Sequence, residues 1–487
     1  MNRKKMRLVS IILMLVLVIS TMACGKKEEA VSADTAVTDV PSDTVVDTNE
    51  PSTEEPTEQV PEEPSTEEPT EPAPTEPSTE EPTDPAPEEP SIEEPTEPAP
   101  EEPSVEKPTE PAPIEPSIEE PGIDVSKYSG MRNITTMELV DEMGIGINLG
   151  NTFESFGDWI EQWGAGGFPS GTVQAYETAW GSPVITKEII QGYANEGFDS
   201  LRIPVHWMNL MSADYTLSAE YIAEVKKVVE WALEAELYVI INIHHDEDGF
   251  FANFATDKDN CMKAYIRVWE QIAEAFRDYD DHLIFEALNE EGGWDSIWNR
   301  WGGTTGKEQA FGILNDINQS FVNTVRASGG NNEVRHLLIS GYYTDIEATC
   351  DAYFKMPEDP AKRCAVSVHY YTPAGFAILE DDADWGKARS TWGTDADFAE
   401  LIRLLDMMET TYIKNGIPVI IGEYGCPVKN KEIESVRLFL TSVCEEALKR
   451  DMCPILWDVT DAQYNRTTCQ MIDQELKRMY NDISAKY

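Results

Sequence analysis

Eight short apolar runs recur along the chain from residue 145 onward. They lie at 145–149, 198–204, 237–243, 282–288, 335–341, 364–371, 417–423 and 452–458. Runs of this length that are apolar at most positions are typical of strands covered on both faces, as in a parallel sheet. The pattern therefore predicts eight parallel strands in the second part of the chain.

Amphipathic stretches separate these runs, at 184–195, 218–235, 258–278, 306–328, 394–415, 430–450 and near 470–485, while the connection 342–363 is irregular. Eight alternations of strand and helix favour an α/β fold of the (β/α)8 TIM-barrel type. A doubly wound open sheet is the alternative, but it usually carries a glycine-rich phosphate turn after its first strand. Gly144-Ile145-Gly146 lacks that spacing.

Residues 1–23 have the pattern of an export signal. The basic segment Asn2–Arg7 precedes 13 mostly apolar residues, 8–20, which is too short a run to span a bilayer comfortably. The following Ala23-Cys24 resembles the processing site of bacterial lipoproteins, with Thr21 where leucine is usual. The resemblance implies lipidation of Cys24 and attachment to the outer face of the cell membrane through this N-terminal lipid alone. Ordinary cleavage and secretion is the alternative.

Residues 24–122 have the composition of a disordered acidic linker. Of the 31 prolines, 21 lie between positions 51 and 121, in 13-residue repeats such as PSTEEPTEPAPTE, and residues 28–121 carry 31 acidic side chains and one lysine. Such a repeat cannot bury enough apolar surface to fold, and its prolines prevent helices and sheet ladders. An extended polyproline chain of about 70 residues reaches up to ~200 Å. We therefore expect a spacer before a folded domain at 123–487.

The formal net charge of −53 narrows the choice of partners. Nucleic acids and anionic lipid surfaces require a basic protein surface, so we expect neither as a direct partner. Without Cys24 seven cysteines remain, an odd number with no Cys-x-x-Cys spacing, and Cys350 and Cys364 are a candidate pair. We expect no metal, no cofactor and a monomeric protein.

Polar and titratable side chains gather where the predicted strands end. In a (β/α)8 barrel the carboxyl ends of the strands carry the active site. Six of the eight predicted strands end there with such groups, and the candidates are Arg202, His244, His245, Asn289, Glu290, His369, Tyr371, Glu423 and Trp457. Adjacent strand residues point to opposite faces, so His244 and His245 cannot easily share a metal ion.

Glu290 and Glu423 end the fourth and the seventh predicted strand, which face each other across a barrel. Two carboxyl groups across a cleft are what the hydrolysis of a glycosidic bond requires, because one protonates the leaving oxygen and the other attacks or activates water. Arg202 and Tyr371 are suited to keep Glu423 ionised, whereas Glu290 beside Asn289 is suited to stay protonated.

Several of these strand ends resemble the motifs of glycoside hydrolase family 5. LIFEALNE, which ends at Glu290, resembles its acid/base motif, and VIIGEYG, around Glu423, resembles its nucleophile motif. LRIPVHW, VIINIHHD, VHYYTP and ILWD resemble its other strand ends, so that the likeness covers roughly residues 131–480. One departure is Glu291, where proline commonly follows the catalytic glutamate.

The resemblance implies a retaining endo-β-1,4-glucanase, or cellulase, with a β-glucan as substrate. Glu290 would be the acid/base, Glu423 the nucleophile, and Asn289 the partner of the sugar 2-hydroxyl. The groups that would orient the nucleophile and the sugar are Arg202, His244, His369 and Tyr371, with His245 in the cleft wall and Trp457 as a stacking platform. NLGNTFE and ETAWGSPVIT resemble the subfamily of endoglucanases and xyloglucanases.

Two alternatives stay open at this point. The enzyme could prefer xyloglucan, lichenan or mannan, or the barrel could be a catalytically silent glycan-binding protein on the cell surface. Aromatic rings stack on the apolar faces of sugars, and we expect glycan subsites among the tryptophans in connecting segments, namely Trp163, Trp180, Trp207, Trp294, Trp298, Trp301, Trp385 and Trp392.

Overall fold

The computed structural model of the protein describes residues 129–245, 253–292, 294, 296–300 and 303–487. The predicted signal peptide, Cys24, the linker and the domain boundary at 123 lie outside the described residues, so these remain predictions.

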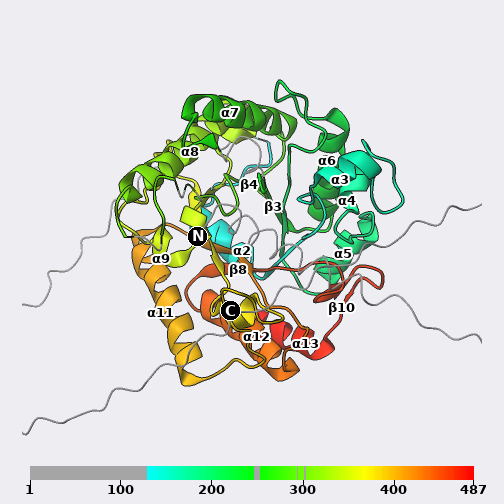
Figure 1. The fold of residues 1–487 in the computed structure, drawn as a ribbon, viewed down its shortest axis with the longest axis vertical. Coiled ribbons are helices and arrows are strands. Elements are labelled where there is room, and N and C mark those ends of the chain that lie inside the picture. The colour runs from blue at the N-terminus through cyan, green and yellow to red at the C-terminus, as the bar shows by residue number, and fades with distance from the viewer. Residues whose placement is uncertain (1–128, 246–252, 293, 295, 301–302) are drawn as a thin grey trace, which may run out of the picture. The chain divides into compact units, whose positions relative to one another are not determined.

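Eight parallel strands form a closed barrel (Figure 1). They are β1 (Gly146–Asn148), β2 (Ser200–Ile203), β3 (Tyr238–Asn242), β4 (Leu283–Glu286), β5 (Leu337–Ser340), β6 (Cys364–Tyr370), β7 (Val419–Tyr424) and β8 (Met452–Leu456). Each strand pairs with the next, and β1 pairs with β8. The predicted (β/α)8 barrel is confirmed, and each of the eight apolar runs contains or overlaps one of its strands.

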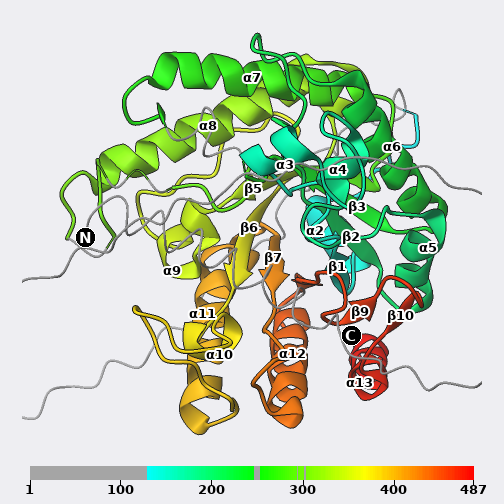
Figure 2. The ribbon, with the colours of Figure 1, turned by 45° about the vertical axis from the view of Figure 1, so that its right-hand side comes forward.

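Helices surround the barrel. The long ones are α5 (Lys187–Asn195), α6 (Ala219–Glu234), α7 (Lys258–Ala275), α8 (Lys307–Ala327), α11 (Asp395–Thr411), α12 (Ile433–Leu448) and α13 (Gln474–Ser484). The side chains of Thr186, Ser218 and Thr394 cap the first turns of α5, α6 and α11 by accepting backbone N–H bonds, as short hydroxyl residues do at helix starts. Figure 2 shows α11 and α12 beside the strands β6 and β7. Within the described residues, no helix is both long and apolar enough to cross a lipid bilayer.

Short elements occupy the connections. They are α3 (Asp158–Trp163), α4 (Val173–Glu177), η3 (Gly330–Glu333), η4 (Tyr342–Thr344), α9 (Ile346–Thr349), α10 (Ala374–Ala377), η5 (Ile413–Asn415), β9 (Tyr464–Asn465) and β10 (Gln470–Met471). The connection predicted to be irregular, 342–363, contains only η4 and α9.

Helix α2 (Thr136–Glu142) closes the amino-terminal end of the barrel. Its Leu139 and Val140, with Met143, pack against the inward-facing side chains of the strands in a cluster that contains Tyr238, Ile240, Ile284, Leu338, Ala365, Ile420, Cys453 and Ile455. In Figure 1, α2 lies inside the ring of outer helices. The barrel interior near the amino-terminal ends of the strands, called the lower half here, is therefore an apolar core. It stabilises the fold through the apolar area that it removes from water.

The barrel interior changes from apolar to polar two residues further along the strands. Because side chains alternate between faces, the next inward positions are Asn148, Arg202, Asn242, Glu286, Ser340 and Ser367, and all of these are 0% exposed. Buried polar groups must be hydrogen-bonded to one another or to the backbone. This polar layer lies directly beneath the carboxyl ends of the strands, where the candidate residues stand.

All seven cysteines of the described part of the chain are free thiols. The candidate pair Cys350 and Cys364 is therefore not a disulfide. The Cys350 thiol contacts the sulfur of Met408 at 3.5 Å, and the Cys364 thiol contacts a carboxylate oxygen of Asp359 at 3.4 Å. Each thiol thus has a partner of its own in the packing around the barrel.

Arg335, just before β5, holds the connection between α7 and β4 at the amino-terminal end of the barrel. The buried guanidinium donates to the carbonyls of Asp280 and Leu283 at 2.9 and 2.8 Å, and to those of Phe276 and Tyr279 at 3.0 and 2.8 Å. One side chain therefore donates to four carbonyls of this connection, three of which also accept from a second donor.

We predict that Arg335→Met lowers the free energy of unfolding by roughly 3 kcal/mol, because the Leu283 carbonyl and Oδ1 of Asn332 lose a buried charged donor and three further carbonyls lose one of two donors. Urea unfolding followed by circular dichroism measures the change. Arg478→Met is the control, because Arg478 is 59% exposed and pairs with Glu475 on the surface of α13. Its loss should cost less than about 1 kcal/mol, and equal losses in the two variants would contradict the role of Arg335.

Candidate active site

Glu423, near the end of β7, lies at the centre of the polar groups at the carboxyl ends of the strands. Its Oε1 accepts a 2.8 Å hydrogen bond from Nη1 of Arg202, and its Oε2 accepts a 2.9 Å bond from the hydroxyl of Tyr371. Nδ1 of His369 lies 3.6 Å from the same Oε2. The carboxylate is 7% exposed. The sequence predicted that Arg202 and Tyr371 face Glu423, and the structure places both in contact with it.

A bulge in β7 turns the Glu423 side chain into the barrel. Val368 and His369 of β6 pair with Ile421 and Glu423 of β7, so that β7 has one extra residue at Gly422. Strict alternation from the inward Ile420 would turn Glu423 outward, because a slip of one residue exchanges the two faces. A side chain at Gly422 would also crowd the site, since a Cβ there would lie 3.2 Å from Nε2 of His369.

Arg202 is held on every side. Its Nε donates to Oε2 of Glu286 at 2.7 Å, its Nη1 donates to Oδ1 of Asn148 at 3.0 Å, and its Nη2 donates to Oδ1 of Asn289 at 3.0 Å. The amide of Asn148 in turn donates to the carbonyl of Gly422 at 2.9 Å. Strands β1, β2 and β4 and the bulge of β7 thus fix a guanidinium that is 0% exposed.

Glu290 follows β4, and its carboxyl side chain is 47% exposed. Its Oε1 lies 2.7 Å from Nδ1 of His369. One oxygen of Glu290 and one oxygen of Glu423 approach each other to within 4.8 Å. The two carboxyl groups therefore face each other across a short gap, with His369 beside both.

Burial governs the charges of this site. Burial raises the pKa of the Glu423 carboxyl, and His369, the Arg202 guanidinium and the Tyr371 hydroxyl oppose that rise. Burial lowers the pKa of His369 to about 4 and holds the pKa of His244 well below its usual value. It also raises the pKa of Tyr371 well above its usual value, so the hydroxyl remains a donor to Glu423. The fixed positive charge beside Glu423 at neutral pH is therefore that of Arg202.

Trp457 and His244 form one side of the site. Their rings are parallel to within 6°, with centroids 6.0 Å apart. Nδ1 of His244 lies 3.2 Å from the amide nitrogen of Asn242 in the polar layer. Gly150 makes room for the indole, because a Cβ there would lie 3.1 Å from the Trp457 ring and 2.5 Å from the Asp458 carbonyl.

His245 points elsewhere. Its ring lies against His244 in an edge-on arrangement with centroids 4.3 Å apart, and against Phe156 and Trp180 at 5.6 and 5.9 Å. His245 is therefore part of an aromatic group that begins beside the site, and its predicted place in the wall of a substrate cleft stays a prediction.

The tryptophans of the connecting segments divide into two groups. Four of them are at most 9% exposed and pack in the hydrophobic core, namely Trp207, Trp294, Trp298 and Trp392. Core packing accounts for these four, so the sequence-based assignment to subsites does not hold for them. Trp163 and Trp385 are 79% and 40% exposed and Trp180 is half-buried, while Trp301 lies outside the described residues.

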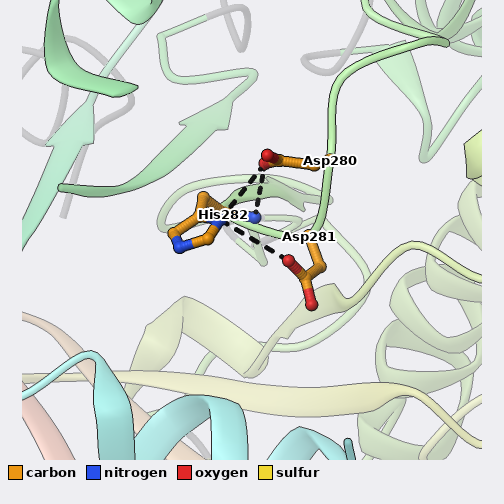
Figure 3. A group of neighbouring side chains, drawn as sticks. All are labelled: Asp280, Asp281 and His282. Atoms are coloured by element: carbon orange, nitrogen blue, oxygen red, sulfur yellow. Dashed lines mark hydrogen bonds and ion pairs between the residues drawn. The ribbon is translucent and has the colours of Figure 1, made fainter. Parts of the chain in front are cut away.

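Two groups of side chains in the described part of the chain have the spacing of possible metal ligands, namely Glu290 with His369 and Glu423, and Asp280 with Asp281 and His282. The second group precedes β4 at the opposite end of the barrel (Figure 3). There Nδ1 of His282 lies 3.3 Å from Asp280 and 3.5 Å from Asp281, and the hydrogen bond to Asp280 raises the pKa of His282. Nε of Arg132 also donates to Oδ2 of Asp281 at 2.9 Å, so protein side chains already supply partners for this group.

Four residues of this environment were absent from the sequence-based site, namely Asn148, Asn242, Glu286 and Ser367. All are inward-facing strand residues of the polar layer. A polar residue two positions after an inward apolar residue is the signal that could have indicated them, because such a position is buried in the barrel.

Two carboxyl groups facing each other at the carboxyl ends of a (β/α)8 barrel are the arrangement that glycoside hydrolases use. Residues 163–463 match the family Cellulase (glycosyl hydrolase family 5). The chain therefore belongs to glycosyl hydrolase family 5, as its motifs indicated.

Three relatives illustrate the similarity. The chain is 34% identical to the xyloglucan-specific endo-beta-1,4-glucanase BoGH5A of Bacteroides ovatus over 70% of this chain and 69% of that protein. It is 37% identical to endoglucanase A of Ruminococcus albus over 69% of this chain and 86% of that protein. The solved structure of a GH5-4 broad-specificity endoglucanase from an uncultured bovine rumen ciliate is 34% identical, with a TM-score of 0.65 over 73% of this chain and 99% of that one.

Proposed function

We propose that the protein is a retaining endo-β-1,4-glucanase in which Glu423 is the nucleophile and Glu290 the acid/base. The approach of the two carboxyl groups to within 4.8 Å carries this proposal. Retaining glycosidases hold their carboxyl groups about 5–5.5 Å apart, whereas inverting enzymes leave about 6.5–9.5 Å for a water molecule. So short an approach favours direct attack on the sugar by a carboxylate over activation of an intervening water.

In the first step an oxygen of Glu423 attacks the anomeric carbon while Glu290 gives its proton to the leaving oxygen. In the second step Glu290 takes a proton from water, which attacks the anomeric carbon and releases Glu423. Nδ1 of His369 suits both states of Glu290. A neutral imidazole can accept from a protonated carboxyl or, as the other tautomer, donate to an ionised one.

The neighbouring groups position the sugar in this proposal. Oδ1 of Asn289 accepts from Arg202, so its amide hydrogens are the donors left for the 2-hydroxyl of the sugar. The indole of Trp457 offers a face on which the sugar ring can stack, and His244 and His245 line the adjoining wall. Tyr371 donates to Glu423 and keeps its Oε2 oriented.

The proposed substrate is a β-1,4-linked glucan that is cut at internal bonds. The relatives named endoglucanases support this choice. The name of the Bacteroides ovatus relative favours xyloglucan as the second candidate, and lichenan and mannan remain further alternatives within the family.

We predict that an activated 2-deoxy-2-fluoro-β-cellobioside inactivates the enzyme and labels Glu423, because the fluorine slows release of the covalent intermediate. Peptide mass spectrometry identifies the labelled residue. Glu423→Gln should be inactive and unlabelled, whereas Glu290→Gln should lose at least about 100-fold in kcat on unactivated glucan, because it lacks the acid. A label on another residue would overturn the assignment, and absence of turnover in the wild type would favour a glycan-binding protein.

We predict that the viscosity of carboxymethylcellulose falls well before many reducing ends appear, as internal cleavage requires. The same assay on lichenan, xyloglucan and glucomannan ranks the alternatives by kcat/KM. Release of single sugars or disaccharides at constant viscosity would contradict an endo mode of attack.

We also propose that the mature protein is a lipoprotein anchored through Cys24, with the linker as spacer. The basic segment, the apolar run and Ala23-Cys24 support this proposal. Two acyl chains are enough for stable membrane attachment. The acidic linker would then hold the barrel away from the membrane, toward an insoluble or bulky substrate.

We predict that radioactive palmitate labels the wild-type protein in the producing cell and that Cys24→Ala abolishes the label and releases the protein into the medium. Cys350→Ala is a matched control that should keep the label, because Cys350 lies in the folded barrel beside Met408. Equal labelling of the wild type and Cys24→Ala would refute the anchor.

A further inference from the structure

Glu286, the last residue of β4, is a carboxylate buried inside the barrel beneath the two proposed catalytic groups. It is 0% exposed, and its contacts lie within the polar layer and not in the cleft. Burial of a carboxylate is costly unless it is paired and hydrogen-bonded. Glu286 lies two positions after Ile284, which points into the apolar cluster. The stability of the core therefore does not explain why a carboxylate occupies this position.

Both oxygens of Glu286 are occupied. Oε2 accepts a 2.7 Å bond from Nε of Arg202, and Oε1 accepts a 2.7 Å bond from the hydroxyl of Ser367 on β6. Since a guanidinium is planar, the bond at Nε and the anchored carboxylate fix the plane in which Nη1 and Nη2 lie. Nη1 is then directed at Glu423 and Nη2 at Asn289.

Glu286 also changes the charge of the site. Arg202 is shared between two buried carboxylates, Glu286 and Glu423. The other groups that act on Glu423 are His369, Glu290 and Tyr371, and of these the imidazole and the phenol are neutral at neutral pH. Without Glu286, the whole charge of Arg202 would act on the nucleophile.

We propose that Glu286 is a positioning residue that orients Arg202 and offsets its charge, so that Arg202 aligns Glu423 without weakening it as a nucleophile. This inference rests on the proposed role of Glu423. The two steps of the reaction place opposite demands on that carboxylate. A more basic Glu423 forms the bond to the anomeric carbon faster, and a less basic one leaves faster when water attacks. The buried Glu286 sets the balance in favour of the first step.

Glu286→Gln tests the charge while keeping the shape, because an amide can still accept from Nε of Arg202 and donate to Ser367. The full positive charge of Arg202 should lower the pKa of Glu423. With an aryl β-cellobioside, the acidic limb of kcat/KM should move down by about one pH unit. The first step should slow by about two- to tenfold, because the reactivity of a nucleophile follows only part of a change in its pKa. The second step, read from kcat on a dinitrophenyl glycoside, should not slow.

Asp359→Asn is the matched control, because it makes the same carboxylate-to-amide change beside a buried arginine at the other end of the barrel. Asp359 accepts from Nε and Nη2 of Arg326 at 2.8 and 2.9 Å. The Asp359→Asn substitution should reduce thermal stability and leave the pH profile of kcat/KM unchanged. If Glu286→Gln does not fold, Glu286→Asp serves instead. That variant keeps the charge, so it should lower kcat and retain the wild-type acidic limb.

An unchanged acidic limb in Glu286→Gln, an equal slowing of both steps, or a shifted limb in Glu286→Asp would overturn the role of Glu286. These outcomes are separate from failure of the proposed mechanism. Labelling of Glu423 by the fluorinated cellobioside in the Glu286→Gln variant shows whether the nucleophile assignment itself holds. A label elsewhere would refute that assignment whatever the pH profile.

Discussion

The burial of one guanidinium governs the design of this barrel end. A fully enclosed arginine needs acceptors on all of its donors and an anion to offset its charge. Arg202 finds four acceptors on both sides of the interior, in Asn148, Glu286, Asn289 and Glu423. Each partner is thereby fixed as well. The precision of the site follows from the cost of leaving any of these groups unpaired.

The barrel interior has an apolar half that stabilises the fold and a polar half that holds the side chains of the proposed active site. The lower half is apolar and is closed by α2, so it gains from area removed from water and tolerates changes that conserve volume. The upper half is a hydrogen-bonded layer in which a single unsatisfied atom is costly. The proposed nucleophile, Glu423, stands on this layer through Arg202, which is how a rigid scaffold keeps a reacting group in place.

The sequence predicted the strands because covered parallel strands are apolar along their length, and it predicted the rim because all strand ends of a parallel barrel meet at one face. It did not indicate Glu286 or Asn148 as part of the site, since their roles depend on partners far away in the chain. The sequence analysis also predicted too many glycan subsites among the tryptophans of the connecting segments. Trp207 and Trp392 are large enough to fill gaps between helices and barrel, and residue type alone does not distinguish that use from a sugar platform. The leader and the linker were predicted from composition, and they remain predictions because they lie outside the described residues.

The extra residue at Gly422 gives β7 two phases. Up to Ile421, side chains alternate between the two faces as regular strand pairing requires. The extra residue exchanges the faces, so that Glu423 points into the barrel and Tyr424 points outward, where it hydrogen-bonds with Tyr480 of α13. The number of residues in β7 before Glu423 therefore sets the direction in which its carboxylate points. The motif around Glu423 places this group in the site only when its spacing is intact. Loss of one residue there would leave every proposed catalytic side chain in the sequence and still turn the Glu423 carboxylate out of the barrel.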